Sequence, residues 1–165
     1  MSVSRQDTET TPAGLGSMRA AASWFIDRPT LPRHGDVTRF ALDFHRYLQR
    51  LMPHIEELAA RLDSDDIPAK AALAGVGEAR RRLIEPEAVG LNGEVTRVKR
   101  LARSVLVLCD HYDMLIDLAV CRACDRAIGD GQSSVSYDQA SPSGGASRSG
   151  RVHTDCANSG IRAGR

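Results

Sequence analysis

The sequence predicts an all-α chain: an antiparallel bundle of three main helices, with a short N-terminal helical arm and disordered termini. Large apolar residues recur at intervals of three and four over long stretches, the spacing that lines one face of an α-helix. Proline and glycine residues divide these stretches into separate helices. Alternation of apolar and polar residues, which is typical of strands, is not found over any comparable length.

The arm begins near Ser17, a residue type that caps helices, and ends before Pro29 because a proline disfavours helical geometry in the residue before it. The first main helix follows Gly35. Pro53 removes one backbone donor within it, which predicts a kink or a junction of two helices. The apolar face of this segment comprises Val37, Phe40, Phe44, Tyr47, Leu48, Leu51, Ile55, Leu58 and Leu62.

Asp66 and Pro68 predict the start of the next helix, with Asp66 as its N-cap and Pro68 in its first turn. Gly75 in its interior indicates either a weak helix or close packing against a neighbour. Its expected apolar residues are Leu73, Val76, Leu83 and Ile84. The last helix has the longest apolar face, with Leu108 expected at the centre of the core. Its other apolar positions are Val95, Val98, Leu101, Ala102, Val105, Tyr112, Leu115, Ile116 and Ala119.

Composition separates a folded domain at 17–128 from a disordered N-terminus at 1–16 and a disordered tail at 129–165. The tail is rich in Ser, Gly and Arg, and its few apolar residues are scattered singly. Such a segment buries too little apolar surface to offset about 1 to 2 kcal/mol of ordering entropy per residue.

Charge and hydropathy exclude several classes of protein. Lys and Arg total 22 against 21 Asp and Glu, so the net charge of +1 gives no bulk attraction to nucleic acid or to an anionic membrane. No apolar run approaches the length of a membrane span, and no signal-peptide core follows Met1. We therefore expect a cytoplasmic protein that binds neither nucleic acid nor membrane.

Three segments are distinctive together: LPRH at 31–34, DIPAKAALAGVGEARRRL at 66–83, and VKRLARSV at 98–105 followed by LCDHYD at 108–113. They resemble a family of small actinobacterial, Streptomyces-type proteins that carry a domain of unknown function and are described as natural product biosynthesis proteins. The resemblance spans about residues 18–125. It implies a setting in specialised metabolism, and it implies no reaction and no catalytic residues.

The pair Cys121 and Cys124 is a candidate metal-ligating motif. In a protein of the cytosol, such a pair indicates metal binding or redox chemistry more often than a disulfide, but with a single pair we expect ordinary thiols near a helix end, and metal binding or redox activity is the alternative. A structural zinc site needs four ligands. Cys156 falls in the predicted disordered tail, and His111 should lie about 15 Å before Cys121 along the helix.

Asp110, Asp113 and Asp117 follow each other at helical spacing, on the face opposite the apolar one. Aspartates at this spacing could hold Mg²⁺ and a diphosphate, but hard-cation sites need several converging oxygens, so we expect a solvated acidic face. If the cysteine pair binds zinc or iron, the candidate ligands are Cys121, Cys124, Asp117 and Asp113, with His111 as a further one and a site shared between subunits as one arrangement. No other cofactor is implied.

The same helix is basic in its first half, at Lys99, Arg100 and Arg103, and acidic from Asp110 onwards. Two copies laid antiparallel would match opposite charges, which makes these residues candidates for a homodimer interface. Ordinary solvation is the alternative, because exposed ion pairs are worth only about 0 to 1 kcal/mol. The cationic run at 80–82 is likewise expected to be a solvated helix face.

No nucleophile motif, phosphate-binding loop or paired Glu-x-x-His motif occurs, so we expect a protein without a catalytic site. The leading hypothesis is a small helical accessory or protein-interaction protein associated with natural product biosynthesis. Its partner would be a second copy or a biosynthetic protein. The alternative is a small-molecule or metal-binding protein that uses the cysteine pair and the adjacent acidic helix face.

Overall fold

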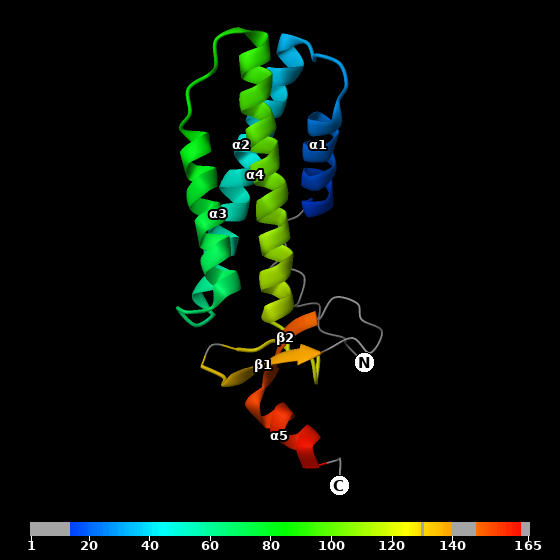
Figure 1. Cartoon of the computed structure of the whole chain (residues 1–165), viewed down its shortest axis with the longest axis vertical. Coiled ribbons are helices and arrows are strands. Elements are labelled where there is room, and N and C mark those ends of the chain that lie inside the picture. Colours follow the sequence, from blue (N-terminus) through cyan, green and yellow to red (C-terminus); the bar gives the residue numbers. More distant parts are fainter. Residues whose placement is uncertain (1–13, 130, 140–147, 163–165) are drawn as a thin grey trace, which may run out of the picture. The chain divides into compact units, whose positions relative to one another are not determined.

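The computed structural model describes residues 14–129, 131–139 and 148–162 (Figure 1). Their elements are α1 (Leu15–Asp27), α2 (His34–Ala60), α3 (Ile67–Leu83), α4 (Gly90–Leu118), β1 (Ser134–Gln139), β2 (Arg148–His153) and α5 (Thr154–Arg162). The mostly helical character predicted from the sequence is confirmed, whereas the two-stranded sheet is an addition to the all-α expectation. No described helix has the length and hydropathy needed to cross a membrane.

The chain divides into two compact units, residues 1–112 and residues 113–165. We call them the helical unit and the C-terminal unit. Helix α4 contributes its longer part, up to Tyr112, to the helical unit and its last residues to the C-terminal unit.

Helix α2 packs against both α1 and α3 in the helical unit. It continues through Pro53 as one helix, where the sequence left open a kink or a junction. The apolar face predicted for α2 is confirmed at the positions whose side chains are buried. One of them, Phe44, meets Phe25 of α1 edge-on, with the ring centroids 5.7 Å apart. The buried residues of α2 are Val37, Phe44, Leu48, Leu51, Met52, Ile55, Leu58 and Ala59.

Helix α3 begins as predicted, because the side chain of Asp66 accepts a hydrogen bond from the Ala69 N–H at 3.0 Å. Its predicted apolar face is wrong in detail, since Leu73 is 46% exposed and Ile84 is also exposed. Small residues are buried instead, and they allow a close approach to the neighbouring helices. The buried residues of α3 are Ala69, Ala72, Val76 and Ala79.

Gly75 of α3 faces His111 and Leu108 of α4. A Cβ at this position would lie 3.1 Å from Cδ2 of His111 and 3.4 Å from Cδ2 of Leu108. The interior glycine therefore marks close packing rather than a weak helix.

Helix α4 buries most of the apolar face that the sequence predicts for it, with Leu108 fully buried, whereas Ile116 and Ala119 are only half-buried. Near its start Glu94 and Arg97 form a buried ion pair, in which Nε of Arg97 donates to Oε2 of Glu94 at 2.9 Å. The same carboxylate accepts the N–H of Ala88 at 2.8 Å. Two hydrogen-bonded partners thus compensate for the burial of this charge.

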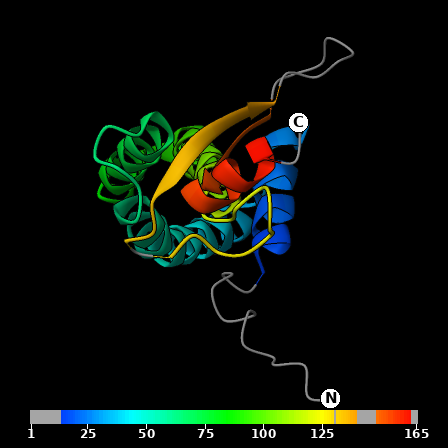
Figure 2. The ribbon, with the colours of Figure 1, turned by 90° about the horizontal axis from the view of Figure 1, so that it is seen from below.

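The C-terminal unit contains a hairpin and a helix. Strands β1 and β2 pair antiparallel, with Ser134 opposite His153 and Gln139 opposite Arg148. Helix α5 packs against both strands (Figure 2). The described residues of this unit bury few apolar side chains, namely Leu115, Leu118, Cys121 and Val152.

These elements fall within residues 129–165, for which the sequence analysis expects disorder. The apolar alternation of β1 is short and its Val135 and Tyr137 are about half exposed, so hydropathy gives little sign of the strand. Residues 140–147 and 163–165 of the expected tail lie outside the described residues, as do residues 1–13 of the expected N-terminal segment. Its last residues, Leu15 and Gly16, belong to α1.

Candidate metal centre

A tight turn after α4 presents Cys121 and Cys124. The N–H of Cys121 donates to the carbonyl of Arg126 at 2.8 Å, and the N–H of Asp125 donates to the carbonyl of Cys121 at 2.9 Å. Asp125 has a φ of 54°, the left-handed conformation that reverses the chain after Cys124. We call residues 121–126 the knuckle.

The other half of the site lies where β2 meets α5. His153 is the last residue of β2 and Cys156 lies in the first turn of α5. The N–H of Thr154 donates to the carbonyl of Ser133 at 3.0 Å, which fixes the start of α5 against the beginning of the hairpin.

Backbone pairing holds the two halves together. The N–H of Arg122 in the knuckle donates to the carbonyl of Arg151 in β2 at 2.9 Å. Gly150 lies beside this contact, and a Cβ there would be 2.7 Å from Cγ of Arg122. The absence of a side chain at Gly150 therefore leaves room for the side chain of Arg122 to cross the strand.

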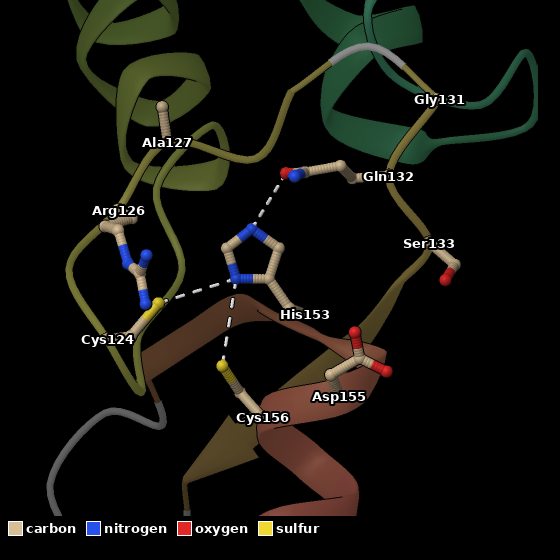
Figure 3. Close-up of a pocket in the computed structure, with 9 residues that line it drawn as sticks. All are labelled: Cys124, Arg126, Ala127, Gly131, Gln132, Ser133, His153, Asp155 and Cys156. Atoms are coloured by element: carbon tan, nitrogen blue, oxygen red, sulfur yellow. Dashed lines mark hydrogen bonds between the residues drawn. The ribbon is translucent and has the colours of Figure 1, made fainter.

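Four ligand atoms converge at this point: the sulfurs of Cys121, Cys124 and Cys156 and a ring nitrogen of His153 all lie within 4.8 Å of one another. Nδ1 of His153 is 3.5 Å from Sγ of Cys124 and 3.8 Å from Sγ of Cys156 (Figure 3). In a tetrahedral zinc site with bonds of about 2.0 to 2.3 Å, neighbouring ligand atoms are about 3.5 to 3.8 Å apart. The two separations between Nδ1 and the sulfurs of Cys124 and Cys156 fall in that range.

The knuckle stabilises a thiolate at Cys121. Burial of this side chain works to raise the pKa of the thiol, but three backbone N–H groups, those of His153, Ala123 and Cys124, point at the sulfur and lower the pKa to about 6. The N–H of His153 lies 3.4 Å from the sulfur. Hydrogen bonds to the charged form favour that form, so the first ligand is ready for a cation at neutral pH.

Cys156 behaves in the opposite way. Its hydrogen bond with Cys124, together with desolvation and the nearby sulfur of Cys121, raises the pKa of Cys156 to about 11. Negative charge is thus concentrated on one sulfur, and the crowded neighbour retains its proton. A cation placed among the sulfurs would remove this repulsion.

A pocket of about 440 Å³ opens beside the cluster and gives solvent access to it. Figure 3 shows Cys124, His153 and Cys156 at this pocket, with Arg126, Ser133 and Asp155 also lining it. The second ring nitrogen of His153, Nε2, is 3.0 Å from Oε1 of Gln132. An ion therefore has an entry path, and the histidine has a polar partner on its outer side.

The structure brings together two of the ligands expected from the sequence, Cys121 and Cys124, and joins them with His153 and Cys156. Asp113 and Asp117 are exposed and are not part of this group, and Asp117 instead pairs with Arg122 at 3.5 Å. His111 lies in the helical unit against Gly75.

The sequence pattern did not indicate His153 as a ligand, and Cys156 fell in the segment expected to be disordered. A usable signal was present: the spacing of Cys121 and Cys124 recurs at His153 and Cys156, so two ligand pairs of equal spacing are separated by a turn-rich segment. The expectation of a disordered tail concealed this pattern.

The residues proposed for an interface between copies have neighbours within the helical unit. Arg100 pairs with Glu85 at 2.8 Å, and Asp110 forms an ion pair with Arg19. Lys99 lines a small pocket next to Phe25, and Arg103 is exposed. The homodimer stays a prediction.

Comparison with known proteins identifies the helical part of the chain as a domain of unknown function. The chain belongs to the family of unknown function DUF6415, which matches residues 16–116, more than half of its length. No curated protein and no solved structure matches the chain. The family match includes most of α4 and ends before Cys121, so the cluster of Cys121, Cys124, His153 and Cys156 lies outside it.

The match confirms the domain of unknown function that the sequence resemblance implied. It names neither an organism nor a pathway. The actinobacterial source, the link to natural products and the cytoplasmic location therefore stay predictions.

Proposed function

We propose that this protein binds one zinc ion through Cys121, Cys124, His153 and Cys156. The observation that carries the proposal is the convergence of four ligand atoms within 4.8 Å, supplied by two separate segments of the chain. Three sulfurs and one imidazole nitrogen form one of the common ligand sets of structural zinc.

The role of this zinc is structural. Four protein ligands complete a tetrahedral shell, whereas catalytic zinc keeps one position for water or substrate. The described residues of the C-terminal unit bury only a small apolar core, and small units of this kind need a further source of stability. Zinc bound at these residues would supply it, because binding free energy is folding free energy where the site forms only on folding.

Metal analysis tests the proposal. Protein purified without chelators should contain one zinc per chain, and Co²⁺ exchanged into the site should give the intense visible bands of a tetrahedral thiolate complex. The Cys124→Ser and Cys156→Ser variants should lose the metal. Cys109→Ala is the matched control, because Cys109 is a buried cysteine of α4 that lies outside the cluster.

Two results would contradict zinc binding. Wild-type protein that contains no metal and takes up no Co²⁺ would exclude the site. Stoichiometric iron, which the same sulfur-rich ligands also accept, would replace zinc as the ion.

For the helical unit we propose the role expected from the sequence, an accessory protein that binds a protein partner in natural product biosynthesis. One observation favours a contact surface: Trp24 is 52% exposed and stacks on Phe40, with centroids 5.3 Å apart, while the guanidinium of Arg28 lies 4.8 Å from the Trp24 ring centroid. Exposed tryptophan and arginine are enriched among residues that dominate binding energy at interfaces.

Sedimentation of the full chain, alone and with candidate proteins from neighbouring genes, tests this role. Trp24→Ala should abolish association while leaving the helical circular dichroism spectrum unchanged. A chain that sediments as a monomer with every candidate would contradict the proposal.

A further inference from the structure

The outer side of His153 carries a second inference, which rests on the zinc site proposed above. A histidine can bind a metal through either ring nitrogen, and the choice depends on which nitrogen carries the proton. In the C-terminal unit the ring of His153 lies between the sulfurs of Cys124 and Cys156 on one side and the amide of Gln132 on the other (Figure 3).

Gln132 is held by a turn at its own backbone. Its N–H donates to the carbonyl of Gly129 at 3.1 Å, and Gly131 adopts a φ of 80° within the turn. In return the N–H of Gly129 donates to Oε1 of Gln132 at 2.8 Å. The side chain of Gln132 is thus fixed by a hydrogen bond that does not involve the histidine.

This second hydrogen bond identifies the atom that faces the ring. The backbone N–H of Gly129 can only donate, so the amide atom that it contacts must be the oxygen. A rotated amide would place an NH₂ group against that N–H, two donors facing each other. Oε1 of Gln132 is therefore an acceptor for both neighbours, Gly129 N–H and Nε2 of His153.

An acceptor 3.0 Å from Nε2 requires the proton of a neutral imidazole to lie on that nitrogen. Nδ1 then carries the lone pair, and it is Nδ1 that lies 3.5 Å from Sγ of Cys124 and 3.8 Å from Sγ of Cys156. We propose that Gln132 is the positioning residue of the zinc site: it holds the proton on Nε2 of His153 and so presents Nδ1 to the metal.

Outer partners of this kind orient a metal-bound histidine and raise its basicity, and their loss typically weakens metal affinity about 10- to 100-fold. The experiment compares zinc affinity in full-length wild-type, Gln132→Ala, Gln132→Glu and Ser133→Ala proteins, using competition with a chelator of known affinity. Gln132→Ala should bind zinc about 10- to 100-fold more weakly. Gln132→Glu keeps an acceptor oxygen, so this variant should retain a zinc affinity within a few-fold of wild type.

Ser133→Ala is the matched control, because Ser133 lines the same pocket and has no side-chain hydrogen bond to His153 among the described contacts. It should leave the affinity unchanged. A second measurement separates positioning from a general loss of structure: long-range ¹H–¹⁵N NMR of the zinc-loaded imidazole reports which nitrogen bears the proton. Wild type and Gln132→Glu should show a protonated Nε2 and a metal-bound Nδ1.

Three results would overturn the inference while leaving the zinc site intact: unchanged affinity in Gln132→Ala, failure of Gln132→Glu to restore a lost affinity, or NMR showing zinc on Nε2 in wild type. Wild-type protein that binds no zinc would instead remove the proposed function and this inference together. The two failures are therefore distinguishable by the wild-type measurement alone.

Discussion

The two units of this chain contain very different amounts of apolar core. The helical unit buries apolar side chains from all four of its helices, whereas the described part of the C-terminal unit buries four. The helical unit resembles an ordinary globular domain, stabilised by the removal of apolar surface from water. The C-terminal unit instead gathers three thiols and an imidazole. The two units therefore depend on different sources of stability, apolar burial in the helical unit and the proposed metal site in the C-terminal unit.

The largest effect is expected from metal removal. Apparent binding free energies of structural zinc are about 10 to 16 kcal/mol, so chelation of zinc or Cys124→Ser should unfold the C-terminal unit. Helices α1–α3 and most of α4 should persist. Limited proteolysis with mass spectrometry checks this, with cleavage expected within residues 113–165. Simultaneous loss of both units would show that they are not independent.

The next effect belongs to the helical core. Leu108 is fully buried, so Leu108→Ala should destabilise the helical unit by about 2 to 5 kcal/mol. Urea denaturation followed by circular dichroism measures this change, and the zinc content per chain should stay the same. A flat response in stability would show that Leu108 is not central to the core, and a loss of zinc would show that the two units are not stabilised separately.

Glu94 gives a smaller effect with a defined pH dependence. The hydrogen bond from Arg97, followed by that from the Ala88 N–H, holds the pKa of the Glu94 carboxyl below its usual range despite its burial. The folded pKa lies below the unfolded one, so this stabilisation is complete above the unfolded pKa and is lost as pH falls through the folded pKa. Glu94→Gln should cost about 2 kcal/mol at neutral pH.

Urea denaturation of wild type and Glu94→Gln at neutral and acidic pH measures this linkage. The difference between the two proteins should shrink as the solution is acidified. A difference that stays constant would show that the charge on Glu94 does not contribute.

Zinc affinity should increase with pH above neutrality. The pKa of Cys156 is raised to about 11, so this thiol keeps its proton in metal-free protein and zinc must displace it. The pKa of Cys121 is lowered to about 6, so this thiol needs no deprotonation there. Each proton released raises the binding constant about tenfold per pH unit, equivalent to about 1.4 kcal/mol. Calorimetry in buffers of different ionisation enthalpy counts the protons, and a pH-independent affinity would contradict this assignment.

The smallest effect is expected at the acidic face of α4. Asp113 is exposed and outside the ligand cluster, so Asp113→Asn should change stability by less than about 0.5 kcal/mol and leave the zinc content unaltered. Thermal unfolding and metal analysis of this variant measure both quantities. Loss of zinc from Asp113→Asn would show that Asp113 is a ligand after all.

The same contrast explains what the sequence could predict. The helical unit follows apolar periodicity, and the N-cap at Asp66 and the buried Leu108 are confirmed. The buried face of α3 is predicted wrongly in part, because the periodicity argument counts large apolar residues. In the structure, close packing places alanines and Gly75 on that face. That choice depends on the distance between helices, which a single sequence does not give.

The C-terminal unit could be predicted only in part. Cys121 and Cys124 were identified by their spacing, but His153 becomes a neighbour only through the pairing of β2 with the knuckle. Low hydropathy from residue 129 onwards indicated disorder, because composition measures apolar burial and takes no account of ligand chemistry. Matching the two equally spaced ligand pairs would have predicted the site.

Gly150 has a consequence for how much change this region can tolerate. One pair of proposed ligands lies in the knuckle and the other lies at the end of β2 and the start of α5, and the two segments meet where the side chain of Arg122 crosses this glycine. A methyl group introduced there would force the side chain of Arg122 to move, and with it the ion pair that Arg122 forms with Asp117 at 3.5 Å, although Gly150 is itself none of the proposed ligands. Mutational sensitivity should therefore extend beyond the ligands to a position with no side chain at all.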